Sequence, residues 1–230
     1  MLSKFFEHPF FNTGMFRAFI SDNDTLFFII CGIVLTVVPY LLGSINFAII
    51  ISGKSYGDDV RSHGSGNAGM TNMLRTYGKK AAALTLLGDA FKAILAAIVG
   101  YYMMGMYGAY IAGFFCVLGH TFPIFFKFKG GKGVVTAAAS ILMCNPIVFI
   151  IILTLFIIIV AIWRFISLGS IMAALLYPVI LSGVDSVLLG HPSGAYIIFV
   201  LLTSILVVVK HKDNIKRLLE GKENKLTFKK

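Results

Sequence analysis

The sequence predicts an all-α integral membrane protein with seven membrane segments, one of them short, an N-terminus outside and a C-terminus in the cytoplasm. Three observations carry this prediction. The 230 residues are 58% hydrophobic and only 13% charged, and the mean hydropathy is +0.88. The apolar residues form long uncharged runs, which a water-soluble globule of this size does not need. The basic residues, which give a net charge of +10, are gathered in the gaps between those runs.

The first apolar run, residues 25–51, is long enough to cross a bilayer as a helix. Pro39 and Gly43 should loosen this helix near its end, where Ser44 and Asn46 place polar groups at membrane depth. Two interpretations stay open here. The segment is either a kinked span in which the serine bonds back to its own helix, or one wall of a polar site.

The second run, residues 81–104, contains Asp89 and Lys92. Their i, i+3 spacing puts both side chains on one helical face, where they can pair. Ionisable groups inside a membrane segment are costly, so they either pair inward or serve a functional site. The spacing alone allows both.

A tight turn near residues 105–108 leads into the third run, 107–126. The next apolar piece, 134–143, is too short to cross a membrane and reads as a half-span helix that starts at a glycine-rich stretch. A helix N-terminus offers free N–H groups to an anion. The remaining runs are 147–162, 167–181 and 195–209, with a turn-rich loop expected at 182–194 around Asp185 and His191.

The distribution of lysine and arginine among the loops predicts how these segments are oriented across the membrane. Loops 52–80, 127–133, 163–165 and the tail 210–230 hold 5, 3, 1 and 8 of the 20 lysines and arginines, whereas the opposite loops 104–107, 144–146 and 182–194 hold none. This is the asymmetry of positive-inside topology. We expect a multi-pass membrane protein with one membrane-embedded domain, residues 25–230, and an N-terminal extension, residues 1–24, at the membrane interface.

The first polar stretch reads HGSGNAGMTNMLR over residues 63–75. Its small side chains leave the backbone open to a ligand, and consecutive N–H groups near glycines form anion-binding concavities. The spacing GxGxxG also matches a dinucleotide fingerprint, but that fingerprint requires a preceding strand, and here an apolar helix precedes it.

The second polar stretch reads KFKGGKG over residues 127–133. It is not a P-loop, because glycine follows Lys132 where serine or threonine is required. Nucleic acid is not an expected partner, since the cations lie in short gaps between apolar runs. The three cysteines lie in or beside apolar runs and no metal-ligand spacing is present, so we expect neither a metal nor a cofactor.

Taken together these motifs resemble one family. The motifs are Gly43-Ser44-Ile45, the stretch from His63 to Arg75, Gly119-His120-x-Phe122-Pro123, Phe128-Lys129-Gly130-Gly131-Lys132-Gly133-Val134 and the tail His211-x-x-Asn214-Ile215-x-Arg217-Leu218. In this order they are similar to the motifs of the bacterial acyl-phosphate:glycerol-3-phosphate acyltransferases (PlsY). The resemblance covers nearly all of the chain from about residue 27.

The resemblance implies transfer of a fatty acyl group from acyl phosphate to the 1-hydroxyl of glycerol-3-phosphate, giving lysophosphatidic acid and phosphate for phospholipid synthesis. Acyl phosphate, glycerol-3-phosphate and membrane lipids are then the partners. The resemblance also implies a location in the bacterial cytoplasmic (inner) membrane with the site facing the cytoplasm, and a monomer is expected. By position the resemblance implies catalytic roles for Ser65, Arg75, Lys132, His211 and Asn214. Substrate or phosphate binding is expected of Ser44, Gly64, Gly66, Asn67, Gly69, Thr71, Asn72, His120, Gly130, Gly131, Gly133 and Ser170, the last with Ser167 close by.

The mechanism that follows needs mainly positioning and charge stabilisation, because acyl phosphate is already activated. Arg75, Lys132 and the two glycine-rich backbones would bind phosphates, and His211 with Asn214 would hold the glycerol-3-phosphate head. The hydroxyl proton could pass to His211 or to the donor's phosphate. We favour the phosphate, since the sequence shows no clear histidine–carboxylate pair, and a covalent acyl-serine is the least favoured route.

Without the resemblance, the same features suit a membrane transporter for an anion or phosphate ester, since basic loops gather on one face beside a broken span. A non-catalytic membrane scaffold is a further alternative. His120 is open to a second interpretation as a buried structural histidine.

Overall fold

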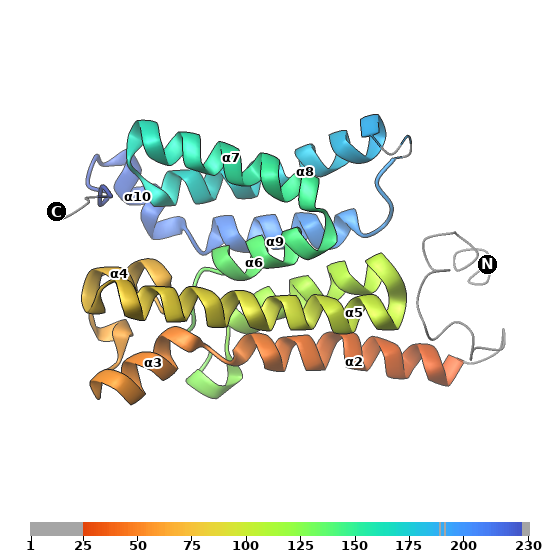
Figure 1. The fold of residues 1–230 in the computed structure, drawn as a ribbon, viewed down its shortest axis with the longest axis horizontal. Coiled ribbons are helices and arrows are strands. Elements are labelled where there is room, and N and C mark those ends of the chain that lie inside the picture. The colour runs from red at the N-terminus through yellow and green to blue at the C-terminus, as the bar shows by residue number, and fades with distance from the viewer. Residues whose placement is uncertain (1–24, 189, 191, 227–230) are drawn as a thin grey trace. The chain divides into compact units, whose positions relative to one another are not determined.

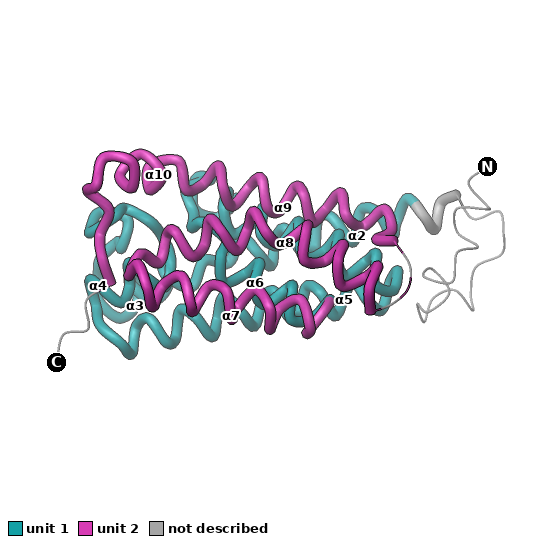
Figure 2. The backbone as a smooth tube through the Cα atoms, turned by 90° about the horizontal axis from the view of Figure 1, so that it is seen from above, with its two compact units in different colours: residues 1–144 teal, residues 145–230 magenta. Residues whose placement is uncertain are grey.

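The computed structural model describes residues 25–188, 190 and 192–226, so the expected extension at 1–24 and His191 lie outside the described residues. Within those ranges every regular element is a helix, which confirms the all-α prediction there. Among the described residues, four helical segments are long and apolar enough to cross a membrane. The chain forms two compact units, Met1–Cys144 and Asn145–Lys230, which Figure 2 shows in separate colours.

In the first unit, helix α2 (Thr25–Ser44) packs along helix α5 (Lys79–Thr121), as Figure 1 shows. Helix α5 bends back on itself at Met104 and Gly105, where Gly105 adopts φ 58° and ψ −148°. Its two arms, 79–103 and 106–121, touch so closely that a Cβ on Gly100 would lie 2.2 Å from the carbonyl oxygen of Gly108. The predicted tight turn between the second and third apolar runs is therefore confirmed.

The first apolar run is one candidate membrane span, Ile29–Tyr56, that is broken into two helices near the expected position. Helix α2 continues through Pro39 and ends at Ser44, and α3 (Phe47–Tyr56) starts after Asn46, whose Oδ1 accepts a hydrogen bond from the Ile49 N–H at 3.1 Å. Gly43 serves close packing, since a Cβ there would lie 2.1 Å from the carbonyl oxygen of Cys116.

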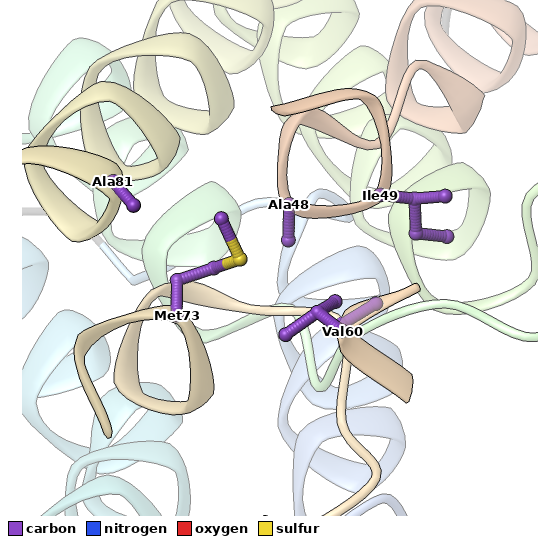
Figure 3. Close-up of a cluster of buried hydrophobic side chains, with 6 residues drawn as sticks. Ala48, Ile49, Val60, Met73 and Ala81 are labelled. Atoms are coloured by element: carbon purple, nitrogen blue, oxygen red, sulfur yellow. The ribbon is translucent and has the colours of Figure 1, made fainter. Parts of the chain in front are cut away.

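The region predicted as a polar loop, 52–80, contains much helix. Helix α3 reaches Tyr56, a short 3-10 helix covers Val60–Ser62, and α4 covers Met70–Tyr77. A cluster of buried apolar side chains holds these pieces together, and the labelled members in Figure 3 are Ala48, Ile49, Val60, Met73 and Ala81. The polar stretch is thus supported by a small apolar core of its own, which fixes its backbone.

Helix α6 (Val134–Cys144) begins directly after Gly133 and packs on α5. Its eleven residues confirm the predicted short helix that starts at the second glycine-rich stretch.

The second unit contains α7 (Pro146–Trp163), α8 (Ile166–Leu188), α9 (Ile197–Val209) and α10 (Lys212–Leu219). The loop expected at 182–194 was wrong in its first half, because α8 runs on to Leu188 and includes Asp185. Asp185 is buried there because its Oδ2 accepts hydrogen bonds from the hydroxyls of Ser193 and Tyr196, each at 2.6 Å. A carboxylate satisfied by two donors can stay inside a helix that is otherwise apolar.

Candidate active site

The side chain of Asn72, on α4, holds the first glycine loop, residues 57–69, in shape. The Asn72 Oδ1 accepts a hydrogen bond from the Ser65 N–H at 3.0 Å, and its Nδ2 donates to the carbonyl oxygens of Val60 at 2.9 Å and His63 at 3.0 Å. Gly64 has φ +55°, and a Cβ there would lie 2.3 Å from the same Oδ1. Asn72 is fully buried, so its predicted contact with substrate is replaced by a role in holding the loop in shape.

A second set of hydrogen bonds lies around Asp58, at the N-terminal end of this loop. Asp58 Oδ2 pairs with His63 Nε2 and accepts from the Tyr77 hydroxyl at 2.9 Å, while Asp58 Oδ1 accepts from the Asp59 N–H at 2.7 Å. The Tyr77 bond, with the Asp59 N–H and His63, lowers the pKa of the Asp58 carboxyl from its ordinary value of 3.8. The expectation that the chain has no clear histidine–carboxylate pair was therefore wrong, although this pair lies in a loop rather than beside His211.

Arg61 joins the first glycine loop to the second glycine loop, residues 127–133. Its guanidinium bonds both carboxylate oxygens of Asp59, at 2.7–3.0 Å. Its Nη1 donates to the carbonyl oxygens of Phe126 at 3.2 Å and Lys129 at 3.0 Å. The Arg61 hydrogen bond also lowers the pKa of Asp59. Arg61 is thus occupied by protein groups and acts as a clamp between the loops.

The two loops come closest at Gly131. The Gly131 N–H donates to the carbonyl oxygen of His120 at 3.1 Å. A Cβ on Gly131 would lie 2.1 Å from His120 Nε2 and 2.6 Å from the carbonyl oxygen of Ala68. Gly131 therefore lies where the second loop, the first loop and the His120 ring edge meet, and no other residue fits there without displacing one of them.

Four predicted site residues keep side chains that are not used to build the loops. Within the described part of the chain, the side chains of Ser65, Asn67, Thr71 and Arg75 make no hydrogen bond or ion pair, and Ser65 and Arg75 are exposed. They lie on the first glycine loop and on α4, whose N-terminus follows Gly69 and carries no side-chain cap. Hydroxyl, amide and guanidinium donors beside an uncapped helix N-terminus form an arrangement suited to an anion.

The second glycine loop contributes backbone and one cation. Gly130 packs against the His120 carbonyl oxygen, and Gly133, with φ +79°, packs against Val117 just before α6 begins. Lys132, half-buried, lies between these glycines. The loop therefore combines glycines, a helix N-terminus and a lysine within one turn of chain, as the sequence predicted.

Two further predicted binding residues are occupied by their own helices. Ser44 is fully buried, donates to the Tyr40 carbonyl oxygen at 2.8 Å and accepts from the Ile124 N–H at 3.4 Å. This confirms the interpretation of Ser44 as a serine bonded back to its helix. Ser170 likewise donates to the Ile166 carbonyl oxygen at 2.9 Å. The donor of each hydroxyl is thus used within its own helix, and substrate contact by these two residues stays a prediction.

The predicted tail residues belong to the second unit and are described there. His211 is buried, and its Nδ1 lies 2.7 Å from the Val207 carbonyl oxygen. Because a carbonyl only accepts, Nδ1 carries the proton, and the neutral ring has its lone pair on Nε2. His211 is therefore held in the tautomer that can accept a hydrogen bond, or a proton, at Nε2.

Glu223 is the residue of this region that the sequence did not single out. Its carboxylate accepts from the Asn214 amide at 2.8 Å, the Ser167 hydroxyl at 3.0 Å and the Arg217 Nε at 2.8 Å. Burial opposes its charge, but these hydrogen bonds outweigh burial and lower its pKa. The available signal was weak, because Glu223 is one of three carboxylates, with Asp213 and Glu220, among the cations of the tail.

The comparisons with known proteins agree on one family. A family model described as glycerol-3-phosphate acyltransferase matches residues 33–221. A glycerol-3-phosphate acyltransferase of Finegoldia magna is 40% identical over 84% of this chain and 96% of its own, and one of Clostridioides difficile is 38% identical over 86% and 97%. One of Paraburkholderia phytofirmans is 42% identical over 86% and 92%.

Two solved structures share the fold. A crystal structure of PlsY (YgiH), an integral membrane glycerol 3-phosphate acyltransferase in its glycerol 3-phosphate form, superposes with a TM-score of 0.75 at 34% identity, over 84% of this chain and 94% of that one. The lysophosphatidic acid form superposes with a TM-score of 0.72 at 32% identity.

Proposed function

This chain belongs to the glycerol-3-phosphate acyltransferase family, and from that membership we propose that it takes its acyl group from acyl phosphate. The enzyme acylates glycerol-3-phosphate for phospholipid synthesis, and lysophosphatidic acid is the product. The observation that carries the proposal is the meeting of two glycine loops at Gly131, beside four site side chains that the protein's own bonds do not use. Two such loops suit two phosphorylated substrates, one the donor and one the acceptor.

The chemistry is an acyl transfer without a covalent enzyme intermediate. The 1-hydroxyl oxygen of glycerol-3-phosphate attacks the carbonyl carbon of acyl phosphate, the bond between that carbon and the phosphate oxygen breaks, and inorganic phosphate leaves. Arg75 and Lys132, with the loop N–H groups, bind the phosphate oxygens, and Ser65 with Asn67 donates to a phosphate or to the developing oxyanion. His211 and Asn214 of the second unit hold the glycerol-3-phosphate head.

The leaving phosphate accepts the hydroxyl proton in this proposal, because it is already at the reacting centre. His211 Nε2 then accepts a hydrogen bond from the glycerol head rather than a proton. The proposal expects His211→Ala to lose no more than about tenfold in kcat, whereas a general base is worth about 10²–10⁴-fold. A loss in that higher range would make His211 the base.

The topology proposed with this function has seven membrane segments: α2, the two arms of α5, α6 as a half-span, α7, α8 and α9. The positive charge of the loops supports an N-terminus outside and a C-terminus in the cytoplasm. Both glycine loops are then cytoplasmic, in the inner membrane, and the protein acts as a monomer.

The test uses the purified full chain in detergent. With acyl phosphate and glycerol-3-phosphate it should release phosphate and form lysophosphatidic acid in equal amounts, and with acyl-CoA in place of acyl phosphate it should do neither. Arg75→Ala should lose the activity, with Lys54→Ala, a cation of α3 outside the loops, as the control. Turnover with acyl-CoA, or movement of labelled phosphate ester into sealed vesicles without a new ester, would overturn the proposal in favour of another donor or a transporter.

A further inference from the structure

The turn that follows α5, residues 123–129, carries apolar and basic side chains that the proposed reaction does not use. It includes the short 3-10 helix η4 (Ile124–Phe126). Three large apolar side chains of the turn are 47–59% exposed, and two lysines beside them are exposed as well. These five side chains form the outer face of the turn: Ile124, Phe125, Phe128, Lys127 and Lys129.

The inner side of the turn is fixed to the rest of the first unit. Phe126 is partly buried and packs on the apolar cluster that supports the first glycine loop. Arg61 Nη1 donates to the carbonyl oxygens of Phe126 and Lys129, and the Ile124 N–H donates to Ser44 Oγ at 3.4 Å. The turn is therefore held from within, so a partner outside the chain can reach its outer face.

The end of α2, which supports this turn, is itself fixed by a buried lysine of α5. Lys92 Nζ lies 2.9 Å from the Gly43 carbonyl oxygen and 2.7 Å from the Ile45 carbonyl oxygen. It also lies 2.8 Å from Asp89 Oδ1 and 3.0 Å from Nδ1 of His120, which is buried too. The pair of Asp89 and Lys92 expected from the sequence is thus formed, and it holds the end of α2 against α5.

Two neighbouring residues of the turn have a backbone conformation that side chains disfavour. Lys127 and Phe128 have φ values of 56° and 57°, and among the described residues the only other non-glycine residue with positive φ is Arg164. Glycine adopts this conformation without a steric cost, whereas a residue with a Cβ does so at a cost in free energy. A lysine and a phenylalanine that are exposed on such a backbone indicate that these side chains serve a function.

The composition of the outer face fits the surface of a lipid bilayer. The candidate membrane segment Lys79–Phe126 ends within the turn, so the turn lies where the apolar run gives way to polar residues. Aromatic rings are favoured at a membrane interface, and basic side chains near it are attracted to anionic lipids. Within the described part of the chain, the side chains of Lys127 and Lys129 form no hydrogen bond or ion pair, so no carboxylate there compensates their charge.

We propose that this turn is a membrane-surface anchor that selects anionic lipid, with its exposed aromatic rings in the headgroup region and its two lysines against the negative charge of the headgroups. The second glycine loop begins at Lys127, and Arg61 holds the Lys129 carbonyl group, so the anchor includes the start of that loop. Lipid contact therefore restricts the loop and raises turnover in an anionic membrane. The effect on turnover rests on the proposed function, whereas the lipid contact does not.

The first experiment needs no activity. Trp163 is the single tryptophan of the sequence, so Phe125→Trp combined with Trp163→Phe gives the full chain one fluorescent reporter, located in the turn. The protein is placed in nanodiscs of equal parts phosphatidylcholine and phosphatidylglycerol, in which one of the two lipids is brominated near its headgroup and quenches tryptophan. We expect both lipids to quench, with phosphatidylglycerol enriched at the reporter by about fivefold for each lysine. No quenching by either lipid would show that protein or water covers the turn, and would overturn the proposal.

The second experiment separates charge from shape in the same reporter protein. Lys127→Gly removes one charge and suits the backbone, because glycine adopts φ 56° without strain; Lys129→Gln removes the other charge. The double variant should unfold at no lower a temperature and should be quenched equally by the two lipids. Lys54→Gln, which removes an exposed lysine of α3, is the matched control and should keep the preference for phosphatidylglycerol. A preference that survives in the double variant would overturn the role of the two lysines.

The third experiment measures turnover in nanodiscs of phosphatidylcholine alone and of the equal mixture. The kcat is taken at saturating substrate, so that repulsion of glycerol-3-phosphate by a negative surface does not enter. We expect the anionic mixture to raise the kcat of the unchanged chain by a few-fold, and to leave that of the double variant as it is in phosphatidylcholine. Equal kcat values of the unchanged chain in both membranes would overturn the coupling to turnover.

Two further outcomes separate the anchor from other roles. A kcat/KM of the unchanged chain that falls when phosphatidylglycerol is added, with no such fall in the double variant, would show that the lysines bind a substrate phosphate that the lipid displaces, and would overturn the anchor. If the unchanged chain released no phosphate in either membrane, the proposed function would fail, while the quenching result would still decide the lipid contact.

Discussion

The two glycine loops are held in shape in opposite ways. The first is tied by side chains of its own segment: Asn72 bonds three backbone groups, and Asp58 gathers His63 and Tyr77. The second uses no side chain of its own for this purpose among the bonds described for it. Its glycines lie against the His120 carbonyl oxygen and ring and against Val117, and the clamp on its backbone comes from Arg61 of the first loop.

The two loops therefore represent two ways of holding an anion-binding backbone in shape: by side-chain hydrogen bonds or by close packing. A loop tied by side chains can lose one bond and keep most of its shape, since each neutral hydrogen bond contributes about 0.5–1.5 kcal/mol. A loop held by close backbone packing has no such reserve, because any added Cβ must displace a neighbour. Substitutions in the second loop should therefore be the more damaging.

The largest expected effect comes from Gly131→Ala. The new Cβ would overlap His120 Nε2 and the Ala68 carbonyl oxygen, at 2.1 and 2.6 Å. Overpacking costs about 1–3 kcal/mol, and a displacement of about 1 Å at the site should lower kcat/KM by about 10²-fold. Phosphate release measures the loss. Gly53→Ala is the matched control, since a Cβ there meets nothing within 4 Å; equal activity of the two variants would remove the contrast between the loops.

A smaller effect is expected from Asn72→Ala in the first loop. It leaves the Ser65 N–H and two carbonyl groups without their partner, a cost of about 1–3 kcal/mol if water cannot replace it. The loop is half open to solvent, so we expect a loss of activity of about tenfold, with faster hydrogen exchange at Ser65. A loss larger than that of Gly131→Ala would show that the first loop, not the second, is the less tolerant.

Next in size should be Arg61→Lys, which tests the clamp between the loops. A lysine keeps the charge but cannot bond Asp59 and two carbonyls at once. We expect a loss of a few-fold in kcat/KM, with equal changes for both substrates, because the clamp touches neither. A rise confined to one KM would instead identify Arg61 as a phosphate ligand.

The smallest effect should be the acid response of Asp58. Its pKa is lower in the folded chain than its ordinary value of 3.8, so its contribution to stability is present above that value and lost as pH falls through the lowered one. Asp58→Asn should flatten this acid-side loss, measured as hydrogen exchange at the loop amides below about pH 5. Lys222→Ala, in an exposed ion pair of the tail, should leave the acid response unchanged.

Much of the fold could be predicted from the sequence, because membrane segments are specified by local composition. The turn at Gly105, the helix that starts after Gly133 and the pair of Asp89 with Lys92 all follow from short-range patterns. The break between α2 and α3, expected only as a kink, has a long-range cause instead. It depends on Lys92, which lies 47 residues away from Ile45 and takes the carbonyls that a continuous helix would use.

The candidate site divides in the same way. Residue types and spacing identified the two loops, and the structure brings them together at Gly131. What the sequence could not separate was which polar side chains build the loops and which remain for a ligand. Asn72 and Ser65 look alike in the motif, yet one is buried and fully bonded whereas the other is exposed. Asp185 is a similar case. The sequence does not reveal its two hydroxyl partners, and these explain why a carboxylate can lie inside α8.

The contacts of Lys92 also bear on how the chain is made. A lone lysine at the middle of a membrane helix costs about 2.5–3.5 kcal/mol to insert. Here two of its hydrogen-bond acceptors are the carbonyls of Gly43, in the last turn of α2, and of Ile45, just after it, and both are synthesised before α5. The segment that is made first thus supplies hydrogen-bond acceptors for the lysine of the later helix. During biogenesis, α2 therefore lowers the cost of inserting Lys92 with α5 if it is already in place beside it.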